Sequence, residues 1–156
     1  MVSAVFELEI STRVTASRAE VWAAVSTMQG VNAELMPFVR MTYPDRASRL
    51  SGADIKPGEI LFRSWLLALG VVPFDLHTLV LAEVIDGEGF VEESSSWMQR
   101  RWRHERRIRG DVGGCVVTDH LVVEPRVRLA MPVVRAVVGR LFAHRHRRLR
   151  VLFGTA

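Results

Sequence analysis

The sequence has one cysteine, one lysine and no long uninterrupted apolar run. The shortage of cysteine and the lack of a long apolar run each exclude a class of protein. Cys115 alone cannot form an intrachain disulfide, so a disulfide-stapled secreted fold is excluded. The longest apolar run, residues 65–74, contains Gly70 and Pro73. It is far shorter than the roughly 20 residues that a membrane-spanning helix needs.

The N-terminus lacks the features of a signal peptide. The opening letters MVSAVFELEIS place Glu7 and Glu9 inside the first apolar stretch. A signal peptide has basic residues followed by an unbroken apolar region. Together with the single cysteine, this favours a cytoplasmic protein.

Internal repeats, low-complexity segments and long linkers are also missing. The chain of 156 residues is 49% hydrophobic and 24% charged, which is ordinary for a globular protein with a substantial core. We therefore expect a single domain spanning residues 1–156.

Positive charge is concentrated in the last third of the chain. Residues 1–99 contain seven basic and thirteen acidic residues, whereas residues 100–156 contain fourteen arginines and four acidic residues. Such asymmetry is found in proteins that bind nucleic acid or anionic membranes. The chain has only one lysine, and the codon bias of a GC-rich genome also places arginine where lysine could stand. The excess of arginine therefore does not require an anionic partner, and a solvated basic face is the favoured interpretation. No nucleic-acid motif or platform of stacking aromatic residues accompanies the charge.

The first half of the chain predicts one strand, two short helices and then further strands. Residues 5–14 alternate between apolar and polar, as in a half-buried strand. Ser17 and Glu20 have capping-box spacing and begin a helix that we expect to end at Gly30. A second short helix is expected over residues 31–36. Strands are predicted at residues 38–43, 59–69, 74–85, 90–96, 101–109 and 115–124.

A long C-terminal helix is predicted over residues 129–153. Pro132 suits its first turn and Gly154 its end. Helical periodicity places an apolar face on this helix, formed by Val134, Val137, Val138, Leu141 and Leu152. Because the strands follow one another through hairpin turns, they form an antiparallel sheet, and this helix is the element long enough to cover it. The fold class is therefore α+β.

The order of elements and several motifs resemble the SRPBCC superfamily, which includes START, birch-pollen-allergen-like and polyketide cyclase-like proteins. The segments that carry the resemblance are FELEISTRVTASRAEVWAAVST, WRHERRIRGDVGGCVVTDHLVVEP and VVGRLFAHRHRRLRVLFG. The resemblance implies a helix-grip fold, in which a curved antiparallel sheet of about seven strands surrounds the C-terminal helix. It also implies a cavity for a hydrophobic or amphipathic molecule, and no metal or redox cofactor.

The 101–124 hairpin supplies the candidate site. A turn centred on residues 110–113 directs alternate side chains of both strands toward the helix. The expected cross-strand pairs are Trp102 with Leu121, His104 with Asp119, Arg106 with Val117, and Ile108 with Cys115. The predicted ligand-binding residues are Trp102, His104, Arg106, Val117, Asp119, Leu121, Val134, Val138, Leu141 and Arg145.

His104, Arg106 and Asp119 form a polar group on the predicted inner face. An isolated buried charge is costly, so the histidine and the aspartate are expected to pair. The pair either orients a ligand or fixes the strand register. Arg145 and Arg148 lie on the apolar face of the last helix. They either bind a carboxylate or phosphate head group at the cavity mouth, or extend their guanidinium groups along the apolar face to solvent, or pair with acidic residues of the sheet.

Three functions follow from these features. The first is a binding or carrier protein for a small hydrophobic or amphipathic molecule. The second is an aromatase/cyclase- or dehydratase-type enzyme, with His104 and Asp119 as acid and base and Arg106 holding an oxyanion. The third is an interaction protein whose basic half meets an acidic partner or, transiently, a membrane surface. No cofactor is expected, and no metal, because His144 and His146 point to different faces of a helix.

Overall fold

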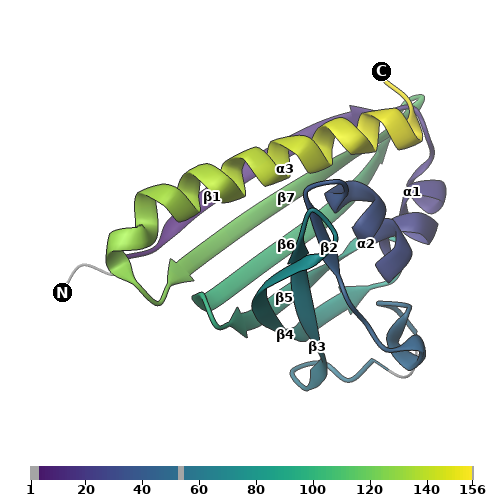
Figure 1. Ribbon diagram of the computed structural model, residues 1–156. Coiled ribbons are helices and arrows are strands. Elements are labelled where there is room, and N and C mark those ends of the chain that lie inside the picture. Colours follow the sequence, from purple (N-terminus) through teal and green to yellow (C-terminus); the bar gives the residue numbers. More distant parts are fainter. Residues whose placement is uncertain (1–3, 53–54, 156) are drawn as a thin grey trace.

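The computed structural model describes residues 4–52 and 55–155, and it has the helix-grip architecture that the sequence predicts. A single antiparallel sheet of seven strands curves around the long helix α3 (Met131–Phe153), as Figure 1 shows. The strand order is β1-β7-β6-β5-β4-β3-β2. The strands are β1 (Phe6–Val14), β2 (Val39–Met41), β3 (Ile60–Ala68), β4 (Val72–Ile85), β5 (Gly89–Ser96), β6 (Gln99–Asp111) and β7 (Gly114–Pro125).

Two short helices, α1 (Arg18–Val25) and α2 (Met28–Leu35), connect β1 to β2. The predicted capping box is present, since the Ser17 side chain accepts from the Glu20 amide and the Glu20 carboxylate accepts from the Ser17 amide. The prediction that Gly30 ends the first helix is wrong. Thr27 caps α2 by accepting from the Gly30 amide, so this glycine lies in the first turn of the second helix.

The helix α3 runs across the inner face of the sheet and begins with Pro132 in its first turn. Its buried face differs from the predicted one. Val134 and Val138 are buried, but Val137 and Leu152 are 59% and 43% exposed. The other buried residues of this helix are Phe142, His144, Arg145, His146 and Leu149. Leu152 has the same helical direction as Val134, since 18 residues make five turns, so its exposure reflects its place in the last turn of the helix and not the helical period.

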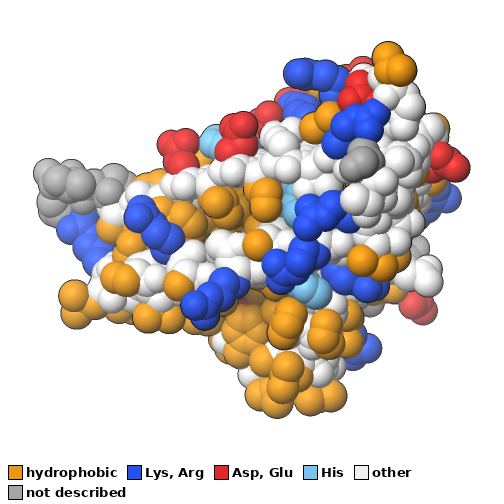
Figure 2. Space-filling view, turned by 90° about the horizontal axis from the view of Figure 1, so that it is seen from above, with side chains coloured by type: hydrophobic (Ala, Val, Ile, Leu, Met, Phe, Trp, Pro, Cys, Tyr) orange, Lys and Arg blue, Asp and Glu red, His pale blue; other side chains and the backbone are white. Residues whose placement is uncertain are grey.

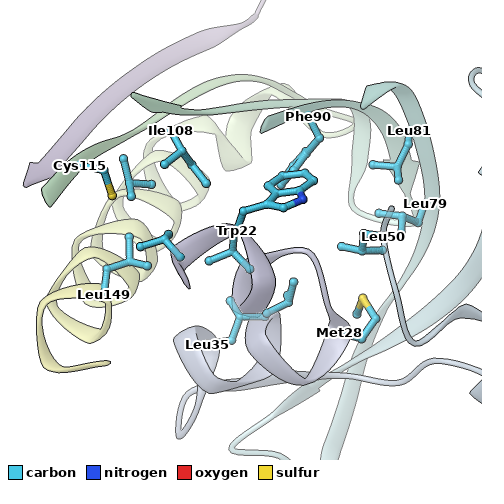
Figure 3. Packing of buried hydrophobic residues seen from close by; sticks show 14 of the residues in the cluster. Trp22, Met28, Leu35, Leu50, Leu79, Leu81, Phe90, Ile108, Cys115 and Leu149 are labelled. Carbon is cyan, nitrogen blue, oxygen red and sulfur yellow. The ribbon is translucent and has the colours of Figure 1, made fainter. Parts of the chain in front are cut away.

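The core consists of two adjacent apolar clusters. The larger is centred on Trp22, which points from α1 toward Phe90 and Ile108 on the sheet (Figure 3). The indole nitrogen of Trp22 donates to Asp86 at 2.8 Å, so this partly polar side chain is satisfied. The smaller cluster places Phe142 and its neighbours on α3 against β1 and β7.

Among the helices of residues 4–52 and 55–155, none is both long enough and apolar enough to span a membrane.

Candidate functional site

A cavity of about 220 Å³ lies between the sheet and α3, with a wall that is mostly apolar. The sheet, α2 and α3 all contribute to it, so the enclosure is a product of the helix-grip arrangement. Its apolar wall is formed by Met28, Val31, Leu35, Val39, Met41, Leu50, Leu66, Phe74, Leu79, Leu81, Phe90, Met98, Trp102, Val133, Val134, Val137, Val138, Leu141 and Phe142. Its polar wall is formed by Asp75, His77, Glu92, Ser96, Gln99, His104 and Arg145.

The rim of this cavity carries exposed apolar side chains. Phe74 and Met98 on the sheet side are 44% and 46% exposed, and Val133 and Val137 on α3 are 66% and 59% exposed. Hydrophobic side chains also gather on the face of the molecule drawn in Figure 2, with basic side chains among them. An apolar rim lets a poorly soluble molecule enter without crossing a charged barrier.

The structure brings six of the ten predicted ligand-binding residues to the cavity wall, and the other four lie elsewhere. The six are Trp102, His104, Val134, Val138, Leu141 and Arg145. The described lining residues do not include Arg106, Val117, Asp119 and Leu121, which are at most 1% exposed. These four side chains are packed in the interior, away from the cavity wall.

The predicted register of the β6–β7 hairpin is wrong by two residues. His104 lies opposite Leu121, and Arg106 lies opposite Asp119. The physical reason is the position of the turn, which is centred on Val112 and Gly113, one residue later than expected, so that Asp111 pairs with Gly114. A shift of two residues preserves the faces of both strands, so the predicted inward residues still point inward.

The predicted contact between His104 and Asp119 is confirmed despite the shift. His104 Nε2 lies 2.8 Å from Asp119 Oδ1, and the ring donates because the carboxylate only accepts. The two residues are now diagonal neighbours across the hairpin, a separation that long side chains span. Arg106 lies on the same face, as predicted.

Arg106 is the centre of a buried ionic network. Its Nε and Nη2 donate to the two oxygens of Asp119, each at 2.7 Å. Its Nη1 and Nη2 donate to the two oxygens of Glu34 at 2.9 and 2.8 Å. Asp119 Oδ2 also accepts from His146 Nε2 at 2.8 Å. The guanidinium is therefore engaged on both sides and is not free to hold an oxyanion in the cavity.

Glu34 and His146 are members of this network that the sequence predictions missed. Glu34 is 1% exposed on α2, and its position three residues after Val31 and one before Leu35 places it on an apolar helical stripe. His146 is equally buried, between Phe142 and Leu149 on α3. A polar residue on an apolar stripe is the sequence signal that identifies both residues.

Arg145 and Arg148 do not pair with acidic residues of the sheet. Arg145 Nε donates to Glu34 Oε1 at 3.2 Å, and its guanidinium stacks over the ring of Phe142 at 4.9 Å. Arg148 Nε donates to the backbone oxygen of Ala33 at 3.1 Å. Both arginines therefore fasten α3 to α2, although Arg145 also reaches the cavity wall.

A second buried pair, His77 and Glu92, lies on β4 and β5 and faces the cavity directly. His77 Nε2 donates to Glu92 Oε2 at 2.5 Å, and His104 Nδ1 lies 3.9 Å from Glu92 Oε1. His77 also packs edge-on against Trp102, with 6.2 Å between ring centroids. The sequence predictions did not include this pair, because its two residues lie on neighbouring strands whose register the sequence does not fix.

The charges of the network keep its carboxyl groups ionised. Burial raises the pKa of Asp119, but Arg106 and then His104 lower it further, so the net pKa lies well below its ordinary value. Burial likewise opposes ionisation of Glu34 and Glu92, and Arg106 and His77 respectively reverse the effect, leaving each pKa lowered. The two carboxylates raise the pKa of Arg106 well above its usual value against the effect of burial.

Within residues 4–52 and 55–155, no group of three or more histidine, cysteine, aspartate or glutamate residues has an arrangement that could hold a metal ion. The buried histidines instead bind carboxylates, a hydroxyl group or a backbone oxygen.

Several solved structures share the fold of this chain. Protein CV1439 from Chromobacterium violaceum aligns with a TM-score of 0.71 at 12% identity, covering 96% of this chain and 98% of that one. A START superfamily protein from Mycobacterium smegmatis aligns with a TM-score of 0.65 at 10% identity, covering 94% of this chain and 96% of that one. The structure of Ara h 8.0201 aligns with a TM-score of 0.56 at 13% identity, covering 93% of this chain and 98% of that one. This chain therefore shares its helix-grip fold with a START superfamily protein and with Ara h 8.0201.

One further similar structure is of a protein from a biosynthetic pathway. The di-domain ARO/CYC StfQ from the steffimycin biosynthetic pathway aligns with a TM-score of 0.61 at 10% identity. The alignment covers 92% of this chain and 49% of StfQ. At such identities the likeness concerns the fold alone.

A comparison with curated proteins found no match. A family model, described as "Domain of unknown function (DUF8410)", matches residues 12–153, which is nearly the whole chain. On this match, the chain belongs to the DUF8410 family.

Proposed function

We propose that this protein binds or carries a small hydrophobic or amphipathic molecule, held in the cavity between the sheet and α3. In this proposal residues 1–156 form one ligand-binding domain that works in the cytoplasm and needs no cofactor. The observation that carries the proposal is the cavity of about 220 Å³ with a mostly apolar wall. An apolar cavity of about 150 Å³ already holds benzene, so there is room here for a two-ring molecule.

The apolar rim and the fold support the same function. Exposed side chains such as Phe74 and Val133 leave the entrance open to an apolar molecule. One of the similar solved structures is titled as a START superfamily protein. The predicted ligand-binding residues that line the cavity, Trp102, His104 and Arg145 among them, remain our proposed contacts.

The test is binding of an apolar two-ring probe, 2-methylnaphthalene, with a variant that fills the cavity. Val138 is 6% exposed and lines the wall, so Val138→Phe puts a phenyl ring into the space for the probe. Calorimetry should show binding to the unaltered protein and at least a tenfold loss in this variant. Val151→Phe is the matched control, because Val151 lies on α3 but is 71% exposed. Absence of binding to the unaltered protein would refute the proposal.

A cyclase- or dehydratase-type enzyme that uses the same cavity is the second candidate. The observation that favours it is the His77–Glu92 pair in the cavity wall, since an imidazole held by a carboxylate is a common general base. Roles for Asp119 and Arg106 in such chemistry are disfavoured because both are saturated by each other and by their neighbours.

A further inference from the structure

The buried ionisable groups of this protein include more acids than fixed cations. Four carboxylates, Glu34, Asp75, Glu92 and Asp119, are at most 6% exposed, against two guanidiniums, Arg106 and Arg145. Both guanidiniums are bound to Glu34 or Asp119, which lie outside the cavity lining. Among the described residues, neither carboxylate of the cavity wall forms an ion pair with an arginine.

The two wall carboxylates make different contacts. Asp75 Oδ1 accepts from the Met98 amide at 3.2 Å. Glu92 Oε2 accepts a hydrogen bond from His77. The hydroxyl oxygen of Ser94, two residues later, accepts from the Val80 amide. Both carboxylates thus add acceptor oxygens to the polar part of the cavity wall.

Gln99 adds a polar atom without a partner to the same wall. The residue lines the cavity and is 9% exposed, and its Oε1 is buried with no hydrogen-bond partner in the described structure. The hydroxyl oxygen of its neighbour Ser96 accepts from the Met98 and Gln99 amides, and no hydrogen bond of the described residues joins Ser96 to Gln99 Oε1. A buried unpaired amide oxygen destabilises the folded protein, and a bound donor removes that cost.

His77 lies in the same wall and directs its Nε2 proton at Glu92. The polar wall therefore presents acceptor oxygens of Asp75, Glu92 and Gln99 from three neighbouring strands, β4, β5 and β6.

Building on the proposed function, we infer that the ligand is amphipathic and carries a hydroxyl group, which the unpaired amide oxygen of Gln99 binds beside the carboxylates of Asp75 and Glu92. A hydroxyl proton satisfies an acceptor of this wall, and the hydroxyl oxygen can also accept from the Gln99 amide if that side chain turns. The apolar part of the molecule then lies between the sheet and Val134, Val138 and Leu141 of α3.

Three two-ring probes of similar shape test this inference: 2-naphthol, 2-methylnaphthalene and 2-cyanonaphthalene. They place a donor, an apolar group and an acceptor at the same ring position. Calorimetry should show that 2-naphthol binds about tenfold more tightly than either of the others, because a site built for a hydroxyl rejects analogues that lack it. Equal binding of all three, or a preference for the nitrile, would overturn the inference and leave the proposed function standing. Failure of every probe to bind would refute both.

Two variants assign the preference to this wall. Gln99→Leu removes the unpaired amide oxygen, so it should leave stability intact or raised while abolishing the preference for 2-naphthol. Asp75→Asn keeps an acceptor for the Met98 amide and should reduce the preference several-fold. Gln29→Leu is the matched control, since Gln29 is exposed on α2. If Gln99→Leu folds and keeps the full preference for 2-naphthol, the assignment is wrong.

Discussion

Arg106 shows how a single residue can be both buried and fully charged. Four hydrogen bonds to Asp119 and Glu34 replace the water that burial removes, and they connect β6 to β7 and to α2. Such a network costs much free energy to desolvate. Once it is buried, however, the loss of one member leaves the other charges without a partner in the interior. Its role in this protein is therefore to fix the positions of the sheet and α2 behind the cavity.

Asp119→Asn should lower the free energy of unfolding by about 3 kcal/mol, because it leaves Arg106 and His146 short of a charged partner in the interior. Urea unfolding monitored by tryptophan fluorescence measures the change. The control is Asp111→Asn, which removes the partner of Arg13 at the surface and should have little effect. A loss in Asp119→Asn no larger than that of the control would show that the network does not stabilise the fold.

Acid should unfold the protein through the same carboxylates. Asp119, Glu34 and Glu92 have lowered pKa values in the folded chain, so the unfolded chain takes up protons first as the pH falls. Their stabilising contribution is complete above the ordinary carboxyl range near about pH 4 and is lost progressively below it. Urea midpoints measured between pH 6 and pH 3 should therefore fall, and more steeply than in Asp119→Asn. A midpoint independent of pH over this range would contradict the assignment.

At the scale of elements, the close approach of α1 and α2 depends on Gly30. A Cβ at this position would lie 1.9 Å from the backbone oxygen of Ala24, a contact that no side-chain rotation can relieve. Gly139 on α3 is the opposite case, because a Cβ there would meet nothing within 4 Å. The same residue type therefore has a packing role in one helix and none in another.

We expect Gly30→Ala to destabilise the protein by about 2–3 kcal/mol, because the backbone of α1 or α2 must move. Gly139→Ala should instead stabilise it by about 1 kcal/mol through helix propensity. Thermal unfolding followed by circular dichroism distinguishes the two. If both substitutions raise the melting temperature, the tight contact between the two short helices is not present in solution.

At the scale of the whole molecule, the arrangement of the sheet and the helices determines the cavity. A sheet that curves around one helix leaves space where the helix stands off the strands, and here apolar residues from five strands, α2 and α3 border that space. A ligand that binds the folded cavity and not the unfolded chain must stabilise the fold by mass action.

Saturation with 2-methylnaphthalene at about 100 times its Kd should stabilise the protein by about 2.7 kcal/mol and raise its Tm. The Val138→Phe variant should show no such rise, because the added ring occupies part of the wall space. Thermal unfolding with and without the probe measures both. A rise of the same size in the variant would place the probe outside this cavity.

Much of the fold could be predicted from local patterns. Alternation in residues 5–14, the capping box at Ser17 and the helical period after Pro132 are short-range features, and each element that they predict is present. The same alternation placed His104, Arg106 and Asp119 on one face of the sheet, because faces repeat every two residues. An error of two residues in register therefore left this part of the prediction intact.

What the tertiary structure decided is which side chains meet. Glu34 on α2 binds Arg106 on β6 across 72 residues of sequence, and His146 on α3 binds Asp119 on β7. His77 and Glu92 face each other from neighbouring strands whose pairing contains a register shift. Local patterns carry no information about such long-range distances, since these depend on how the sheet curves and where α3 crosses it. The amino-acid sequence thus determined the elements and their inward faces, whereas tertiary packing determined the ionic network and the residues that line the cavity.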